Sequence, residues 1–207
     1  MKKNHVENKR ETSTKAYVDS LQDKYSKLNV VRVDLGYKKP HSDRVVLGDA
    51  NKDLNHMLNN RRGKLSIFEH QVGYICKKEY TEDKGVHFHT VFFYNGQKVK
   101  NDVIKAKQIG EYWNEAITKN KGSYHSCNLN ADKVYGKKNA VGMLDHTDKD
   151  RREKLDKAIS YLCKDDEKQD IAPVKTNARD KSFVRGIIQK PKSKVGRPRN
   201  KVSKDQR

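Results

Sequence analysis

The chain has 207 residues, of which 33% are hydrophobic and 35% are charged, so it can form a core over only part of its length. Its 46 lysine and arginine residues outnumber 27 aspartate and glutamate residues, which leaves a formal net charge of +19. This balance favours one domain with a tail that binds a polyanion, and nucleic acid is the first candidate.

Two classes of protein are disfavoured by what the sequence lacks. No run of 18 apolar residues occurs and the N-terminus has no apolar signal region, so we expect a cytoplasmic protein without a membrane segment. The three cysteines, Cys76, Cys127 and Cys163, are too few and too scattered for a disulfide framework. Since no Cys-x-x-Cys pair occurs, a structural zinc protein is the weakest interpretation.

The first elements follow a polar segment, residues 1–11, which we expect to be a flexible N-terminus. Apolar and aromatic side chains recur at helical spacing over residues 13–28, which predicts a helix capped by Ser13 or Thr14. Residues 30–35 are rich in β-branched side chains and predict a strand, whose Arg32 and Asp34 share a face. After a turn at residues 36–42, Asp49 can cap a helix that extends to about residue 60.

A β-hairpin is predicted at the centre of the chain. Residues 72–79 read as a strand, residues 81–85 as a turn, and the alternation from residue 86 to residue 90 as the start of the next strand. Two strands this close in sequence form an antiparallel pair. His87 and His89 then lie on one face, because alternate residues of a strand point the same way.

These two histidines are candidate ligands of a divalent cation. If the hairpin loop is odd in length, Glu79 lies opposite His87 and on the same face. A slip of one residue would bring Lys78 to that position instead. In the first register two imidazoles and a carboxylate meet, whereas the alternative is a pair of hydrogen-bonded surface histidines.

The remaining elements complete an α+β pattern. An Asn95-Gly96 turn precedes a helix from about residue 101 to residue 117, and short strands are expected at residues 124–128 and 141–144. A charged helix from about residue 149 to residue 165 carries a buried stripe composed of Leu155, Ala158, Ile159 and Leu162. This order predicts a central antiparallel β-sheet with flanking helices, spanning residues 12–171.

The composition changes at residue 172. The last 36 residues contain twelve lysines and arginines against two aspartates, a net charge of +10. Such a block repels itself too strongly to pack, so we expect residues 172–207 to be a basic DNA-binding tail.

Tyr161 is the second candidate for chemistry. It lies at the edge of the apolar stripe of its helix, and Lys157 and Lys164 lie on the same flank, four residues before and three after. Nearby positive charge favours a phenolate, and the same flank suits a phosphate. The alternative is a boundary tyrosine with a packed ring and a solvated hydroxyl group.

Taken together, a metal-binding strand, a lysine-flanked tyrosine and a basic chain suit phosphodiester transesterification. The metal would polarise the scissile phosphate while the tyrosine attacks it.

The ordered motifs resemble those of a known enzyme class. His87-Phe88-His89 resembles the HUH motif of rolling-circle replication initiators and relaxases, and residues 161–164 resemble their tyrosine motif. Residues 32–35 resemble the strand that precedes the HUH hairpin. The nearest resemblance is to inovirus-type replication proteins, also found in cryptic prophages and phage satellites, and it covers about residues 28–200. The segments that carry it are residues 73–75 with Glu79, 85–89, 109–113 and 158–164.

This resemblance implies a replication initiator endonuclease that nicks one DNA strand at a specific site, forms a 5′-phosphotyrosyl intermediate and rejoins strands. It implies that His87, His89 and Glu79 are metal ligands, with Tyr161 as nucleophile and Lys164 as its assisting cation. The ion would be Mg²⁺ or Mn²⁺, because phosphate and water oxygens fill the remaining positions. The substrate would be a single-stranded or hairpin origin in a bacterial host cell.

Two departures from the pattern set further expectations. Many initiators carry two tyrosines, whereas this helix offers only Tyr161, so a second subunit or another nucleophile would complete strand transfer. No Gly-x-x-x-x-Gly-Lys-Ser/Thr motif occurs, so a host helicase is an expected partner. Five basic residues are expected to contact DNA: Arg32, Lys157, Arg185, Arg197 and Arg199.

The tail contains one further motif. Residues 194–199 resemble half of an AT-hook, whose arginines enter the narrow minor groove of A·T-rich duplex. The alternative is a non-specific basic tail, whose phosphate contacts weaken steeply with salt.

Other functions fit the same fold. A relaxase or a transposase would use the same chemistry, and a non-catalytic DNA-binding regulator would keep the fold without the reaction.

Overall fold

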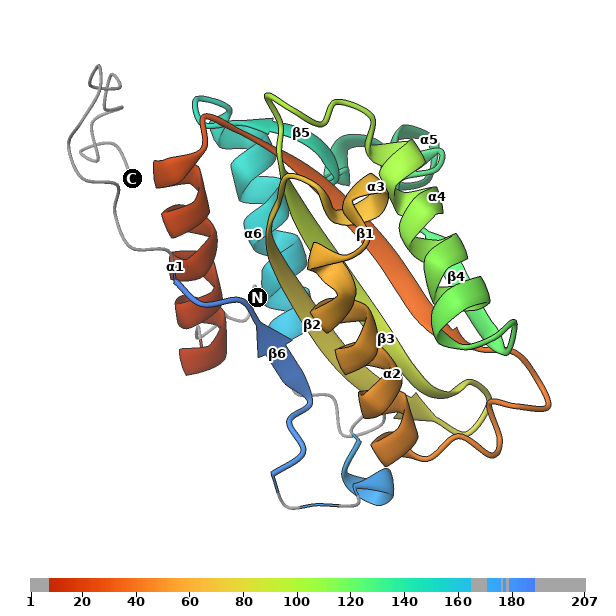
Figure 1. The fold of residues 1–207 in the computed structure, drawn as a ribbon. Helices are drawn as coiled ribbons and strands as arrows, with labels where there is room; N and C mark the ends of the chain where they lie inside the picture. The colour runs from red at the N-terminus through yellow and green to blue at the C-terminus, as the bar shows by residue number, and fades with distance from the viewer. Residues whose placement is uncertain (1–7, 165–170, 176, 178, 189–207) are drawn as a thin grey trace.

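The computed structural model describes residues 8–164, 171–175, 177 and 179–188 (Figure 1). Its architecture is an antiparallel six-stranded sheet with helices on both faces, which confirms the predicted α+β class. The strand order is β4-β1-β3-β2-β6, and β5 pairs with β1 beside β4.

Three long strands form the centre of the sheet: β1 (Lys27–Tyr37), β2 (Gln71–Thr81) and β3 (Gly85–Asn95). β2 and β3 are the predicted hairpin. Gly85 begins β3 at a φ of 66°, a left-handed conformation that favours glycine, and a Cβ atom there would collide with the carbonyl oxygen of Ser42. Glycine at this position therefore lets the loop pack closely where the His-containing strand starts.

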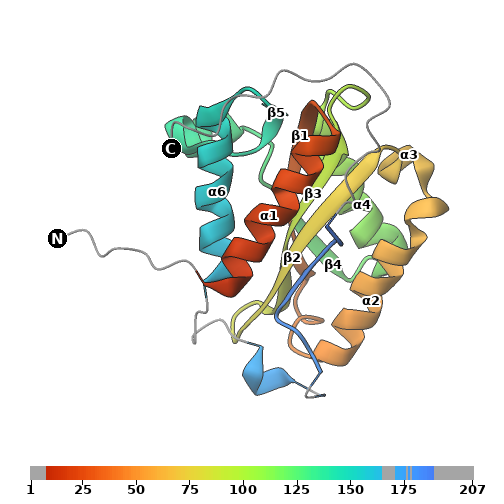
Figure 2. The same ribbon diagram turned by 90° about the vertical axis from the view of Figure 1, so that its left-hand side faces the viewer.

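The helices form two groups, one on each side of the strands (Figure 2). The first group is α2 (Leu47–Asn59), the short α3 (Leu65–Phe68) and α4 (Asp102–Tyr112), which continues as a π-helical turn, η2 (Trp113–Ile117). It packs on Phe88, Phe92 and Tyr94 of β3 and forms the larger core.

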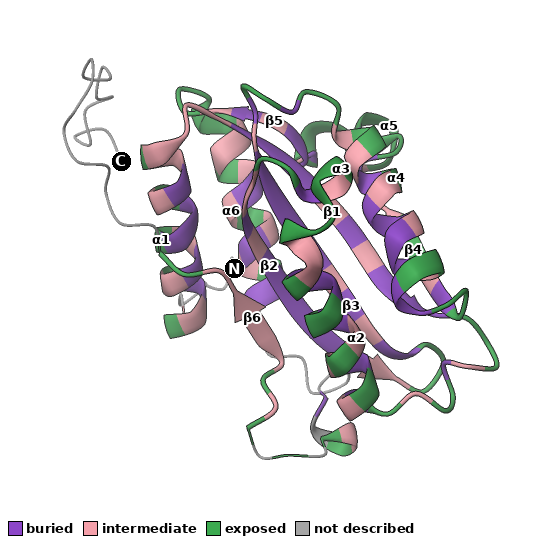
Figure 3. Cartoon of the chain, in the orientation of Figure 1, coloured by how far each residue is buried: buried purple, intermediate pink, exposed green. Residues whose placement is uncertain are grey.

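The second group is α1 (Lys9–Lys24) and α6 (Lys149–Cys163). These helices cover alternate residues of the same central strands, including Val30, Ile75 and Phe93. Figure 3 shows the resulting band of buried residues along the strands beneath the helices. Burial of this apolar area contributes about 25 cal/mol per Å² and is the main interaction that holds the helices on the strands.

Short elements complete the chain. They are η1 (Asn60–Arg62), β4 (Gly122–Ser126), α5 (Ala131–Tyr135), η3 (Gly136–Lys138), β5 (Gly142–Asp145), η5 (Ala172–Val174) and β6 (Phe183–Arg185). None of the helices in the described ranges combines the length and apolar character that a bilayer crossing requires.

Predicted and observed elements differ at both ends of the domain. The first helix begins at Lys9 rather than near residue 13, because Asn8 caps it by accepting a hydrogen bond from the Glu11 amide and also donates to the Cys163 carbonyl. Residues 9–11 are therefore helical. At the other end, β6 lies within the predicted tail. It pairs with β2 because Phe183 interrupts the basic run and packs on the α1–α6 core.

Candidate metal centre

The hairpin register brings the three predicted ligands together. Glu79 pairs directly with His87, as the odd-loop register predicts, and Lys77 pairs with His89. One ligand atom from each of Glu79, His87 and His89 lies within 4.8 Å of the others. We call these three residues the triad.

Both imidazoles of the triad present the same nitrogen to Glu79. The Nε2 atoms of His87 and His89 lie 3.5 and 3.0 Å from Oε2 of Glu79. On the opposite side of each ring, Nδ1 of His87 lies 3.0 Å from the Gly85 carbonyl oxygen, and Nδ1 of His89 lies 2.8 Å from Oδ1 of Asp34. The Asp34 contact is a close charge contact rather than an aligned hydrogen bond.

This arrangement suits metal binding. An acceptor beside Nδ1 keeps a proton on that nitrogen, so Nε2 is the nitrogen at which a cation can bind. Two imidazoles and a carboxylate are ligands that divalent ions accept, and three protein ligands leave positions for water and a phosphate oxygen. The residues therefore fit the divalent ion that the sequence predicts.

Lys77 fixes the carboxylate of the triad. Its Nζ atom lies 2.6 Å from Oε1 of Glu79, and the two side chains are only 9% and 4% exposed. Because Lys77 holds Oε1, the other oxygen, Oε2, is directed at the two histidines. The sequence contained a signal for Lys77, since alternation along the strand places it on the same face as Glu79.

The carboxyl groups of Glu79 and Asp34 both have lowered pKa values. Burial would raise the pKa of Glu79, but hydrogen bonds from His87, His89 and Lys77 outweigh burial and hold this pKa well below its usual range. For Asp34, burial acts in the same direction, and contacts with His89 and Arg32 again lower the pKa. Glu79 is therefore anionic at neutral pH, as a cation ligand has to be.

His89 has the opposite shift. Burial lowers its pKa, but Asp34 and Glu79 outweigh burial and raise the pKa to about 9. A cation that binds His89 at neutral pH must therefore displace a proton from the imidazole.

Arg32 and Asp34 extend the centre onto β1. The Nε atom of Arg32 lies 3.4 Å from Oδ1 of Asp34, the same oxygen that faces His89. The two residues thus pair with each other. His125 on β4 lies opposite Asp34 on this face, but its side chain is exposed and outside the triad.

Tyr161 lies on the exposed flank of α6. Its side chain is 62% exposed, and its hydroxyl group makes no hydrogen bond to another described residue. Of its two predicted lysine neighbours, Lys157 pairs with Glu153 at 2.7 Å, and Lys164 is the exposed residue that ends the helix. The structure therefore has an exposed phenol on this helix, and no described contact joins it to the triad.

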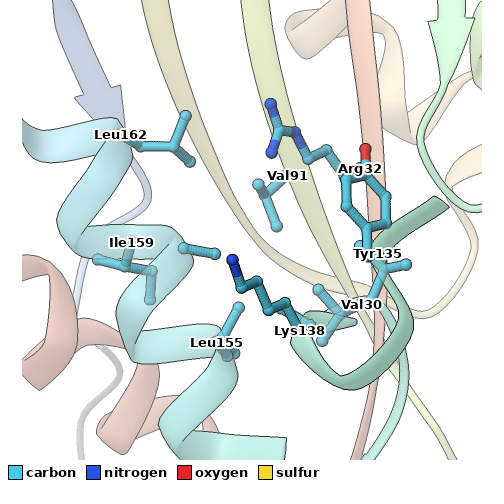
Figure 4. A pocket seen from close by; sticks show the side chains of 11 residues that line it. Val30, Arg32, Val91, Tyr135, Lys138, Leu155, Ile159 and Leu162 are labelled. Atoms are coloured by element: carbon cyan, nitrogen blue, oxygen red, sulfur yellow. The ribbon is translucent and has the colours of Figure 1, made fainter. Parts of the chain in front are cut away.

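An apolar pocket lies between α6 and the strands (Figure 4). Ala158, which lines it, lies three residues before Tyr161 and is its neighbour on the helix surface. Arg32 also lines it, so the pocket adjoins the charged chain that leads through Asp34 to His89. Tyr135 also lines the pocket. Burial and a hydrogen bond with Cys127 raise the pKa of Tyr135 to about 12.

The other predicted DNA contacts have different positions. The guanidinium group of Arg185 lies over the Tyr17 ring, 5.3 Å from its centre, and donates to the Gly186 carbonyl, so it packs against α1. Arg197, Arg199 and the AT-hook-like segment lie outside the described residues.

Two contacts of the centre have no sequence signal. The contact between Asp34 and His89 depends on β1–β3 pairing, and Tyr135 reaches the centre from a short helix that the composition does not predict. Both depend on contacts between segments far apart in the chain.

Comparison with known proteins identifies the family. No curated protein and no solved structure matches the chain. A family model described as the YagK/YfjJ C-terminal domain matches residues 1–183, which is most of its length. This chain belongs to the YagK/YfjJ C-terminal domain family, a family of cryptic-prophage proteins.

Proposed function

We propose that this protein is an HUH endonuclease that initiates rolling-circle replication of a prophage, phage or satellite element. It would nick one DNA strand at a specific site and later rejoin strands, acting in the bacterial cytoplasm. The observation that carries the proposal is the convergence of two Nε2 atoms on Oε2 of Glu79, with an acceptor beside each Nδ1.

The triad would hold Mg²⁺ or Mn²⁺. When bound, the ion would polarise the scissile phosphate and offset the negative charge that develops on it. Lys77 keeps Glu79 oriented and Asp34 keeps the His89 ring oriented, so the ligand geometry is built by the chain itself.

Tyr161 would be the nucleophile. Its oxygen forms the new bond to phosphorus while the bond to the 3′ oxygen breaks, which leaves a 5′-phosphotyrosyl link and a free 3′ hydroxyl. The phenolic proton passes to solvent and the leaving 3′ oxygen takes up a proton. The exposed side chain of Tyr161, with Lys164 at the helix end, is accessible to a DNA strand.

Binding of DNA is supported by charge. The formal net charge of +19 favours a polyanion. Arg32 lies on β1, which pairs with the strand that carries His87 and His89, and Lys157 lies on the helix that carries Tyr161. Arg185 and the tail would add phosphate contacts, and a host helicase would unwind the duplex.

The test is formation of a covalent adduct. Purified protein, Mn²⁺ and single-stranded origin DNA of its own element should yield a protein–DNA band that survives denaturing electrophoresis. Tyr161→Phe should abolish the band, whereas Tyr124→Phe, which removes the hydroxyl of a tyrosine on the opposite face of the sheet, should retain it. An adduct formed by Tyr161→Phe would show that another group is the nucleophile.

A non-catalytic DNA-binding regulator is the second candidate. It is favoured by the chain of ion pairs that links Lys77, Glu79, His89, Asp34 and Arg32, because these side chains can satisfy one another's charges as structural contacts. This function predicts duplex binding that is unchanged by chelation of metal and by His87→Ala.

A further inference from the structure

We propose that the apolar pocket beside α6 binds one unpaired base of single-stranded DNA, next to the phosphate that is cut. This inference rests on the proposed nuclease function and adds a subsite to it. The pocket is the part of the α1–α6 face where the helix and the strands are not fully in contact.

The pocket has apolar walls on opposite sides. Leu155, Ile159 and Leu162 project from α6, and Val30 and Val91 project from the strands toward them (Figure 4). A base can bury the apolar area of its flat faces against such walls, and burial of this kind is non-directional, so it does not require a particular base.

The rim of the pocket is polar and basic. Arg32, Tyr135 and Lys138 lie there, so donors are available both for a base edge and for a phosphate. Lys133, Lys137 and Lys138 are exposed on α5 and η3 beside it. Positive charge around an apolar recess complements a nucleotide, which combines an apolar face with an anionic backbone.

The position of the pocket connects the two halves of the proposed chemistry. Arg32 belongs both to the pocket and to the pair with Asp34 that faces His89. On the other wall, Ala158 lies three residues before Tyr161 and is its neighbour on the helix surface. A base held here would fix its adjoining phosphate near both the triad and the helix of the nucleophile.

The test separates base contacts from charge contacts. Two probes of about 12 nucleotides, within the usual site size of single-strand binders, have equal length and charge: oligothymidylate and an abasic oligomer. Affinity is measured by fluorescence anisotropy with a chelator present, so that no cleavage occurs.

The variant is Ala158→Phe, which fills the pocket from α6, and its matched control is Ala16→Phe at an exposed position of α1. Ala158→Phe should weaken oligothymidylate binding about tenfold, equivalent to about 1.4 kcal/mol for one lost base contact, and leave abasic binding unchanged. Equal oligothymidylate affinity in the two variants would overturn the proposal.

A second variant distinguishes a filled pocket from a folding defect. If Ala158→Phe has lost its helical circular dichroism, Ala140→Phe fills the pocket from the opposite wall and must give the same selective loss. The outcome is independent of the nuclease assay. A protein that forms the adduct but lacks this selective loss overturns the pocket alone, and a selective loss without any adduct overturns the nuclease proposal alone.

Discussion

One face of the sheet has two halves that differ in chemistry. On β3, Val91 and Phe93 are buried under α1 and α6, whereas His87 and His89, at the preceding alternate positions, belong to the triad. β2 repeats the change, from the buried Ile75 to Lys77 and Glu79. The same two strands thus supply a core beneath the helices and a charged centre beyond them.

The charged half of this face has no apolar core of its own, so its strands are held in position by the apolar half. The apolar half anchors the strands, and their pairing continues without interruption into the charged half. There, most charged groups have an opposite charge within 4 Å, which offsets the cost of burial. Stability and metal binding should therefore be separable by substitution.

The largest effect on stability is expected in the apolar half. Phe93→Ala removes a fully buried ring and should lower the free energy of unfolding by about 3 to 5 kcal/mol. Urea denaturation with and without Mn²⁺ measures this loss and also the stabilisation by metal, which should persist. Disappearance of the metal effect in this variant would show that the two halves are not independent.

Removal of a metal ligand should abolish the stabilisation by metal. Saturating Mn²⁺, about 100 times its dissociation constant, should stabilise the wild type by about 2.7 kcal/mol, and His89→Ala should lose this increment. His125→Ala is the matched control, because its exposed histidine lies on the same face outside the triad. If both variants keep the increment in thermal unfolding, the triad is not the metal site.

Asp34 should act through His89. Asp34→Asn keeps the shape of the side chain but removes the charge beside Nδ1, and loss of such a contact costs roughly 10- to 100-fold in metal affinity. Titration calorimetry with Mn²⁺ measures the change. An unchanged affinity would show that this contact orients nothing.

The smallest effect is a pH dependence that belongs to the apolar half. Burial raises the pKa of Tyr17 to about 12, so its contribution to stability is complete below pH 10 and is lost as pH rises toward 12. By pH 11 the wild type should have lost about 1 kcal/mol more than Tyr17→Phe. Parallel urea curves for the two proteins from pH 9 to pH 11 would contradict this account.

Local patterns predicted the centre better than the boundaries. The strand alternation placed His87 and His89 on one face and limited the hairpin to two registers, because a hairpin register depends on neighbouring residues. The structure has the register with Glu79 opposite His87 rather than Lys78. The sequence also predicted the apolar stripe of α6, with Tyr161 at the edge of that stripe.

Contacts between segments far apart in the chain could not be predicted from the sequence. Asn8 gains part of its role from the Cys163 carbonyl, and β6 forms because Phe183 meets a core assembled from other elements. The approach of Asp34 to His89 likewise requires the pairing of β1 with β3. Each depends on tertiary packing, which overrides composition and local propensity.

The ion pair between Lys77 and Glu79 has a consequence for how the centre is loaded. Lys77 and Arg32 already balance the two carboxylates, so a divalent ion would bring charge that no described side chain of the centre compensates. A phosphodiester would supply the missing anion. Metal and DNA should therefore bind cooperatively, each raising the affinity for the other by the same factor, and the protein would retain its ion tightly only while it holds a strand.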